Sequence, residues 1–561
     1  MEDGNTSHAT ADEIREHEQR QFQMLATASR HLAAGTAIIP ELEALVAAIE
    51  PTTKSLSATG LPSAIRDLNT DLATLRWLVD ELSPSPPVTL PSATLDRLAK
   101  KLEVGTVVAQ VVARWAVVKR CRGFVALKRT FQSTSREDRQ RIVAQKIEAG
   151  ASNSGANGTN IGSGGRRGVE KGEMHRTLRE QAKAEVIVVG RGAEWVDVRW
   201  ITAERLAGQM ADCGWAWGDY EPGDGVDAGE WADMPFAKQV RRVIAAARLN
   251  RHEYRIPRVH LVLPNLSRGA NEDIDVLLEQ LALVDGGVPV TVSDATSPFL
   301  TTPPSAADIT TTIASMVPDD MDLLTPTLNM EHTILVDLIS DLTHVRLAPQ
   351  PWHSRTTREQ IAEENRHPHG VMARRLYPML RGRRLVCTHE AAAHFHEMLA
   401  TVGTPSEKER GTLLVPLSEP ESCTSHGTLR TRFQALSAHA LPEDVQFPVE
   451  ILPAEPAWDL DTVRSAVDEG TLPAVAWAVA QGGRLKSSRF STFMYGWAAQ
   501  VATLTSNKEI RAHLKTWVEE GRTADDETGP QVRCVDITRN LLAKSATPPE
   551  GWKGGAANGN E

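Results

Sequence analysis

Two glutamates in the C-terminal part of the chain each stand where an expected strand passes into an expected helix. Glu331 follows a short apolar run that ends at Met330, and Glu390 follows Thr388, a candidate N-cap, in LVCTHE. Hard divalent cations prefer carboxylate oxygen, so side chains of this type can take part in metal chemistry. The helix dipole by itself also favours a carboxylate in a first helical turn, which gives Glu390 a purely structural explanation.

Five arginines lie just before the strand that precedes Glu390, in the segment MARRLYPMLRGRR. Their nearness in the chain to the glutamates suits contact with phosphate. A solvated helix face with a turn explains them equally well, and Tyr377 is the only aromatic residue among them, so base stacking has little support. The candidate substrate-binding residues are Arg374, Arg375, Arg381, Arg383 and Arg384.

Three histidines, His389, His394 and His396, lie close to Glu390 in the chain. Neither HExxH nor its inverse spacing is present, so we expect surface histidines on a helix rather than a metal cluster. Residue order alone predicts no Ser/His/Asp arrangement.

The elements that must position these candidates belong to an expected C-terminal domain, 322–545. Short strands are predicted to end at Met330 and Cys387, each followed by residues at helical spacing, and QVRCVDI (531–537) predicts a further strand. The tail that follows, 546–561, is expected to be disordered.

Residues 184–300 predict a small α/β domain. The β-rich runs AEVIVVG and EWVDVRW are separated by a glycine-containing turn, which favours a hairpin. RVHLVL and VPVTV predict strands, and they alternate with expected helices at 236–249 and 273–283.

Residues 1–133 predict a helical region. Apolar residues recur at helical spacing through 11–49, 65–82 and 95–131. Basic residues near the end of the third segment are better explained by helix packing and solvation than by binding of nucleic acid. Residues 134–183 contain a run of Gly, Ser and Asn and are expected to form a flexible linker.

Composition bounds the class of protein. A chain of 561 residues exceeds the roughly 250–300 residues that one core supports, so two or more folded units of mixed α/β class are expected. A net charge of −11 confines any polyanion binding to a local basic patch. Five cysteines without a CxxC pair favour a reducing compartment. The polar, acidic N-terminus and the lack of 18 continuous apolar residues predict a cytoplasmic or nuclear protein that does not enter a membrane.

Several segments resemble one uncharacterised eukaryotic family, domain of unknown function 1308 (DUF1308, UPF0415 type), whose members have a PIN-like C-terminal domain. LNMEHTILVDLISDL is similar to the family's opening "NLDxTTLI", and FMYGWAAQVATLTSNKEIR to its ending "GTGDTLxAxTxTAN". The longest block, LVCTHEAAAHFHEMLATVGTPSEKERGTLLV, resembles "CESAVxxFxxILxTxGGPxERxRAxxL". The resemblance implies a mainly parallel sheet flanked by helices over 322–545.

That resemblance also implies where an acidic metal site would lie. PIN domains gather three or four acidic residues at the carboxyl ends of parallel strands to hold Mg²⁺ or Mn²⁺, which orients a water at a phosphodiester. Carried over position by position, the site falls on Glu331, Glu390, Trp497 and Asn507, so two carboxylates and one amide remain as metal ligands. Asp337 and Asp341 are expected on the same helix as Glu331, with Asp341 too far along the axis to replace a ligand.

The expected function is therefore a degenerate metal-dependent ribonuclease fold acting in RNA metabolism, with Glu331 and Glu390 as the catalytic residues if activity survives. The alternative is a non-catalytic scaffold that binds RNA or protein. The N-terminal helices are a further candidate surface for protein partners, with the α/β domains as a platform.

Overall fold

The computed structural model describes residues 11–543, apart from 52, 54, 85, 87, 154–162, 285, 286, 305–307, 368 and 418–425, together with 547 and 548. The chain divides into two compact units. Unit 1 contains 1–252 and 256–318, and unit 2 contains 253–255 and 319–561. The expected disordered tail, 546–561, lies almost wholly outside the described residues.

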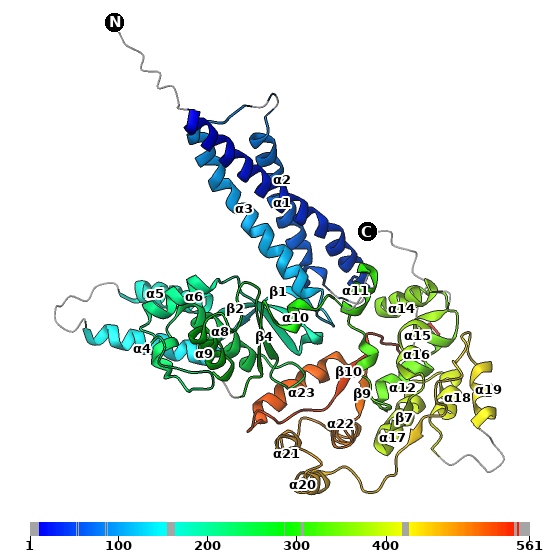
Figure 1. The fold of residues 1–561 in the computed structure, drawn as a ribbon. Helices are drawn as coiled ribbons and strands as arrows, with labels where there is room; N and C mark the ends of the chain where they lie inside the picture. The colour runs from blue at the N-terminus through cyan, green and yellow to red at the C-terminus, as the bar shows by residue number, and fades with distance from the viewer. Residues whose placement is uncertain are drawn as a thin grey trace. The chain divides into compact units, whose positions relative to one another are not determined.

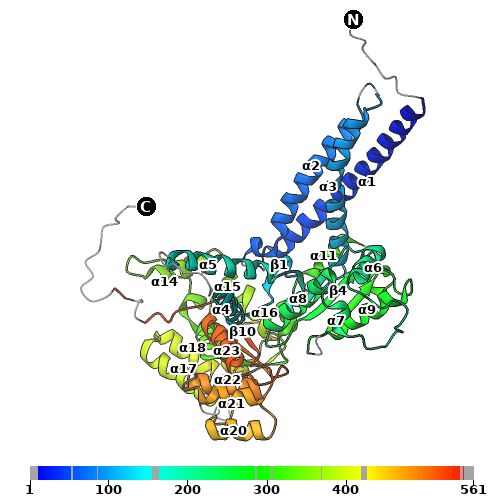
Figure 2. The same ribbon diagram turned by 90° about the vertical axis from the view of Figure 1, so that its left-hand side faces the viewer.

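Unit 1 begins with three long helices that run side by side (Figures 1 and 2), α1 (Ala11–Ile49), α2 (Leu61–Leu82) and α3 (Ser92–Val118). Helix α1 buries a stripe of residues spaced three, four or seven apart, as in a coiled coil. Its buried members are Met24, Ala28, Gly35, Ile38, Leu42, Leu45 and Ile49. The helices expected over 11–49 and 65–82 are present.

The third N-terminal helix ends earlier than expected. Helix α3 stops at Val118, and residues Ala126–Gln132, which were expected to be helical, form strand β1. Gly123 adopts a φ of +61° between them, a conformation that side-chain-bearing residues rarely adopt. Beyond this break, β1 pairs with β2, which overrides the local helical spacing.

The sheet of unit 1 has the strand order β1-β2-β3-β4-β5. Strand β2 is antiparallel to both β1 and β3, whereas β3, β4 and β5 are parallel to one another. The predicted hairpin and the strand RVHLVL are confirmed, whereas the last strand begins two residues later than expected. The bounds are β2 (Lys183–Val189), β3 (Glu194–Val198), β4 (Arg258–Leu263), β5 (Val290–Asp294), α6 (Ala203–Asp212), α7 (Ala228–Trp231), α8 (Pro235–Leu249), α9 (Glu272–Leu283), α10 (Pro298–Thr301) and α11 (Ile309–Met316).

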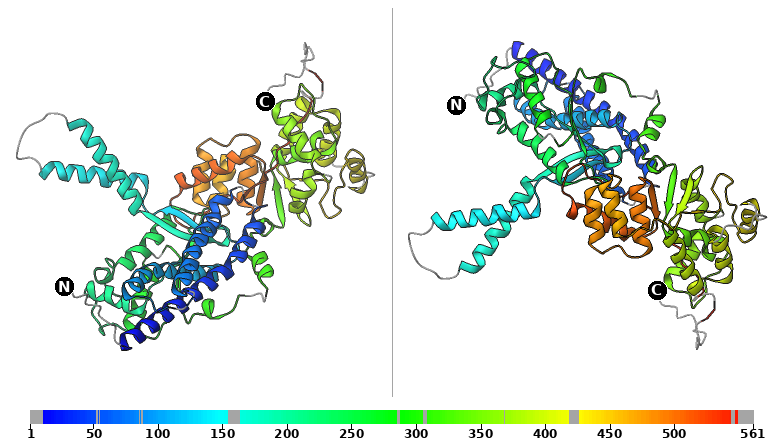
Figure 3. Two further views of the ribbon diagram at one scale, coloured as in Figure 1. Left: turned by 90° about the horizontal axis from the view of Figure 1, so that it is seen from above. Right: turned by 90° about the horizontal axis from the view of Figure 1, so that it is seen from below.

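The expected linker is largely helical where the structure describes it. Helices α4 (Arg136–Asn153) and α5 (Ser163–Gln181) pack against each other (Figure 3). The Ser135 hydroxyl accepts a hydrogen bond from the Asp138 N–H at the start of α4, and straight-chain residues with good helix propensity follow. The most Gly-, Ser- and Asn-rich part, 154–162, lies outside the described residues.

Unit 2 contains a wholly parallel sheet of order β10-β9-β6-β7-β8. The strands are β6 (Thr327–Met330), β7 (Arg384–Cys387), β8 (Glu450–Ile451), β9 (Ala502–Thr505) and β10 (Val532–Cys534). The chain starts in the middle at β6, builds outward through β7 and β8, and then returns to place β9 on the other side of β6. The mixed α/β class with a parallel sheet flanked by helices is thus confirmed.

Two hydrophobic clusters accompany this sheet. One includes Leu328, Leu385 and Leu504 from the strands and residues of α12 and of α15 to α19, and the other lies among α20 to α23. The helix bounds are α12 (His332–Ile339), α13 (Asp341–His344), α14 (Arg355–Asn365), α15 (Gly370–Arg375), α16 (Tyr377–Leu380), α17 (His389–Val402), α18 (Pro405–Leu414), α19 (His426–Ala435), α20 (Leu460–Asp468), α21 (Ala474–Gln481), α22 (Ser488–Ala498) and α23 (Lys508–Gly521).

One helical stretch among the described residues, Arg15–Ile49 of α1, is long and apolar enough to span a membrane by length and composition. The core helix of a soluble protein passes the same test. In this structure α1 packs against α2 and α3.

Candidate functional site

The carboxyl ends of β6 and β9 form the edge where the direction of sheet building reverses. In open parallel sheets, ligands bind in the crevice at such a switch point. Glu331 directly follows β6, and its backbone N–H donates to the Leu504 carbonyl of β9 over 3.0 Å. Thr388 follows β7 at the same edge, and its hydroxyl lies 3.0 Å from the Ser491 hydroxyl of α22. We call this the carboxyl edge of unit 2.

The Glu331 carboxylate is almost fully buried at this edge, with 1% of its surface exposed. Its Oε2 accepts hydrogen bonds from the Thr333 N–H at 3.1 Å, from the Thr505 hydroxyl at 3.1 Å and from the Thr333 hydroxyl. Burial by itself raises the pKa of Glu331, but neighbouring His332 and the Thr333 donors outweigh burial, so the pKa falls below its ordinary value. Glu331 is therefore an anion at neutral pH.

An imidazole and a guanidinium face the other oxygen of this carboxylate. His332 Nδ1 lies 2.9 Å from Glu331 Oε1, and Arg489 Nε lies 4.0 Å from the same atom. The two atoms lack the alignment of a hydrogen bond, and each is buried without a hydrogen-bond partner. Arg489 stands in the first turn of α22 and keeps 43% of its side chain exposed. An arginine thus stands over the buried carboxylate and also reaches solvent.

Glu390 lies in the first turn of α17, as expected, and Thr388 caps that helix by accepting from the Ala391 N–H. Within the described part of the chain, the Glu390 side chain makes no hydrogen bond or ion pair. One turn along, the His394 ring stands edge-on to the His332 ring, with 4.8 Å between centroids. The rings of His332 and His394 therefore connect Glu331 with the face of α17 that carries Glu390.

Of the three histidines expected at the surface of a helix, His389 is exposed, whereas His394 and His396 are partly buried. His396 Nε2 lies 2.7 Å from the Val415 carbonyl oxygen. His394 is partly buried by its ring contact with His332. Packing of α17 against α12 and α18, which residue spacing within α17 does not reveal, explains the difference.

Asn507 caps helix α23. Its side-chain oxygen accepts from the Glu509 N–H at 3.1 Å and from the Ile510 N–H at 3.2 Å. An amide oxygen that already holds two N–H donors has little capacity left for a metal ion. The position fits a structural role in starting α23.

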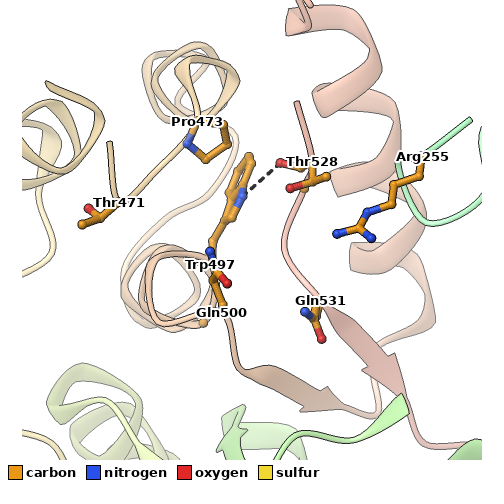
Figure 4. Close-up of a pocket in the computed structure, with 9 residues that line it drawn as sticks. Arg255, Thr471, Pro473, Trp497, Gln500, Thr528 and Gln531 are labelled. Carbon is orange, nitrogen blue, oxygen red and sulfur yellow. Dashed lines mark hydrogen bonds between the residues drawn. The ribbon is translucent and has the colours of Figure 1, made fainter. Parts of the chain in front are cut away.

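Trp497 lies in the last turn of α22, whereas Arg489 at the carboxyl edge lies in the first. Its indole N–H donates to the Thr528 carbonyl over 3.1 Å (Figure 4), and the ring belongs to the cluster of α20 to α23. Trp497 therefore does not fill the space beside Glu331. Arg489 and His332, which do stand there, were missed by sequence reasoning, although a basic residue in the first turn of a helix was a visible signal.

Asp337 is a second buried carboxyl group close to this edge. The Ser506 hydroxyl donates to its Oδ2, and the Arg539 N–H donates to its Oδ1 over 2.7 Å. Burial raises the pKa of Asp337 to about 7 against these hydrogen bonds, and the negative charge of Glu331 adds to the rise. Asp341, expected on the same helix, begins the separate helix α13 and pairs with Arg410.

The arginines expected to bind substrate are dispersed. Arg381, Arg383 and Arg384 lie at the amino end of β7, opposite the carboxyl edge, because a strand carries the chain from one edge of the sheet to the other. Arg381 faces Asp444 at 3.5 Å, and Arg384 forms a two-pronged pair with Glu450.

The remaining arginines of this group also differ in their surroundings. Arg383 donates to the carbonyls of Met321, Leu324 and Thr325. Arg375 donates to the Asp536 carbonyl over 3.0 Å, whereas Arg374 is exposed. The structure thus does not gather the five arginines into one phosphate-binding surface.

The carboxyl edge does not fit a Mg²⁺ or Mn²⁺ ion. Among the residues that the structure describes, no three His, Cys, Asp or Glu side chains are grouped as metal ligands. Magnesium needs several converging oxygen ligands, whereas Glu331 is committed to two threonines and already faces His332 and Arg489. The positive charge that a metal would supply at Glu331 comes instead from the Arg489 guanidinium.

Unit 1 holds a separate Ser-His-Glu arrangement that residue order did not predict. His260 Nε2 lies 2.9 Å from the Ser293 hydroxyl, and His260 Nδ1 lies 3.3 Å from Glu194. Ser293 is only 5% exposed, and the Phe299 ring packs against the imidazole. The serine is closed to substrate, so the arrangement satisfies buried polar groups of the sheet.

Comparison of the chain with protein-family models, with curated proteins and with solved structures finds no match.

Proposed function

We propose that unit 2 is a PIN-like domain of RNA metabolism that binds an RNA phosphate at its carboxyl edge through Arg489, without metal-dependent cleavage. The wholly parallel sheet with its first strand in the middle supports a PIN-like relationship, as does an acidic residue directly after that strand. The observation that carries the function is the position of Arg489, which stands over Glu331 with 43% of its side chain exposed.

The electrostatics of the edge favour a phosphate. Helices α12, α17, α22 and α23 begin directly after strands or loops at this edge, so the positive ends of their dipoles point toward it. Glu331, Thr388 and Asn507 cap three of these helices, whereas the N-cap residue of α22, Ser487, makes no side-chain cap. Arg489 in that uncapped first turn adds planar N–H donors of the kind that bind phosphate.

Hydrolysis finds less support. Metal-assisted cleavage needs an ion that activates water, and the Glu331 carboxylate is surrounded by threonine donors, an imidazole and a guanidinium. Glu390 has a free carboxylate in the described region, but one such group cannot assemble a magnesium site. In this proposal, unit 2 derives from a nuclease fold that has lost its metal site but still binds a phosphate.

Binding of fluorescent single-stranded RNA, measured by anisotropy over a range of salt concentrations, tests the phosphate contact. Arg489→Gln is expected to weaken binding of every sequence and to reduce the salt dependence by about one phosphate contact. Arg381→Gln is the matched control, because it removes the same charge from an exposed arginine at the opposite edge of the sheet. Equal affinities for wild type, Arg489→Gln and Arg381→Gln would remove RNA from the proposal.

A cleavage assay tests the second part of the proposal. Wild-type protein is incubated with the same RNA and Mg²⁺ or Mn²⁺, and no product above the level of a metal-free sample is expected. Metal-dependent product that disappears in Glu390→Gln would show that the edge is an active nuclease.

A further inference from the structure

A small cavity lies in unit 2 at the amino ends of β9 and β10, at the edge of the sheet opposite Glu331. Its volume is about 110 Å³, enough for a small polar ligand rather than a single water. Gln500 and Gln531, which precede the two strands, line it together with Arg255, Trp497, Thr528 and Gly529 (Figure 4).

The backbone at Gln500 is held in an unfavourable conformation. Helix α22 ends in a Schellman motif, in which the Gln500 N–H donates to the Trp497 carbonyl and the Val501 N–H to the Gly496 carbonyl, over 3.2 and 3.0 Å. Gln500 occupies the left-handed position of that motif with a φ of +52°, where glycine is the usual residue. A glutamine there strains the backbone but places an amide side chain against the cavity, and such strain is typical of functional positions.

Hydrogen-bond donors around the cavity lack protein partners. Within the described part of the chain, the side chains of Arg255, Gln500 and Gln531 make no hydrogen bond. The Arg255 guanidinium points toward the loop of Thr528 and Gln531 (Figure 4). A guanidinium offers five donors and no acceptor, so its natural partner is a group that accepts hydrogen bonds and carries negative charge.

The position of Arg255 in the chain is fixed by the packing of the preceding residue, Tyr254, which belongs to the same unit. The Tyr254 side chain is buried, and its carbonyl accepts from Arg522 Nη2 over 3.0 Å. A Cβ atom on Gly529 would come within 2.4 Å of the Tyr254 ring, so this close contact requires glycine. The Trp497 N–H is used by Thr528, so the indole forms a wall of the cavity and contributes no free donor.

We infer that this cavity binds a small oxyanion group, a phosphate or a carboxylate, through the Arg255 guanidinium and the amides of Gln500 and Gln531. The inference does not depend on RNA binding at the carboxyl edge, because the cavity lies at the opposite edge and shares no residue with it. In this arrangement the Gln500 amide contacts the ligand from the strained backbone position.

Isothermal titration calorimetry on the full chain at constant ionic strength tests this site, with inorganic phosphate and acetate as the two probes. Wild type and the control Arg381→Gln are expected to bind one of the probes saturably. Arg255→Gln and Gln500→Gly are each expected to weaken that binding about tenfold or more, the effect of losing one charge-assisted hydrogen bond.

The Gln500→Gly variant also separates binding from folding. Glycine adopts the left-handed conformation without strain, so the melting temperature of this variant without ligand is expected to rise while its affinity falls. A structural glutamine would instead give lower stability with unchanged binding. Absence of saturable binding of both probes to wild type, or equal binding by wild type and both cavity variants, overturns the inference.

Discussion

Replacement of Asp337 by asparagine is expected to change how the stability of the protein depends on pH. In wild type, burial raises the pKa of Asp337 from 3.8 to about 7, so the folded state holds a proton that the unfolded state releases. The stabilising effect of this proton is present below pH 4 and is lost as the pH rises toward 7. A shift of this size corresponds to about 4 kcal/mol over the whole range, or about 1.4 kcal/mol per pH unit.

The geometry around Asp337 allows the amide. The Arg539 N–H can donate to an amide oxygen as it does to the carboxyl, and an amide N–H can donate to the Ser506 hydroxyl, which rotates to accept. Because asparagine does not titrate, Asp337→Asn should gain about 3 kcal/mol of unfolding free energy relative to wild type between pH 5 and pH 8. The other charged groups facing the site, Glu331 and Arg539, are the same in both proteins.

Urea unfolding of both full-length proteins at pH 5, 6, 7 and 8 measures this difference, and subtraction cancels every other titrating group. The difference should grow up to pH 7 and then level off. Parallel stability curves, or a variant that is less stable by the same amount at every pH, would refute the assignment of Asp337 as a carboxyl group that is protonated on folding.

Three further substitutions test the packing and the caps. Gly35→Ala should destabilise unit 1 by about 1 kcal/mol in urea unfolding, because its Cβ would lie 2.7 Å from side chains of α2 and α3; Gly208→Ala, whose Cβ meets no atom within 4 Å, should not destabilise the protein. Arg410→Met should lower the unfolding free energy by about 3–5 kcal/mol, because it leaves the buried Asp341 carboxylate without its cation. Adding Asp341→Asn should recover part of that loss, and a double-mutant cycle without coupling would contradict the pairing. Asn507→Ala should lower the unfolding free energy by about 1 kcal/mol through loss of the α23 cap and leave RNA affinity unchanged, whereas weaker RNA binding at equal stability would point to a ligand role for this residue.

Local residue patterns predicted the local elements well. Period-two apolar runs and turn glycines marked β2, β3 and β4, and Thr388 was recognisable as a helix cap because its hydroxyl and the following residues form a self-contained motif. The prediction failed where partners distant in the chain override propensity, as in β1, whose pairing with β2 replaces the expected helix. Helix α4 was not predicted, because the glycine-rich run that follows it led to the whole of 134–183 being assigned as a linker.

By itself, the sequence determined the mixed α/β class, most strand positions and the placement of Glu331 and Glu390 at strand-to-helix junctions, because these depend on spacing within a few residues. Only the tertiary structure decided what surrounds Glu331. The order of the sheet places β9 beside β6, and this brings Thr505, which lies 174 residues later in the chain, and the first turn of α22 to the Glu331 carboxylate. Strand direction likewise sends Arg384 to the edge opposite Glu390, although the two are neighbours in the sequence. Separation along the chain does not determine separation across the sheet. The chemistry of the carboxyl edge depends on which residues lie close together across the sheet.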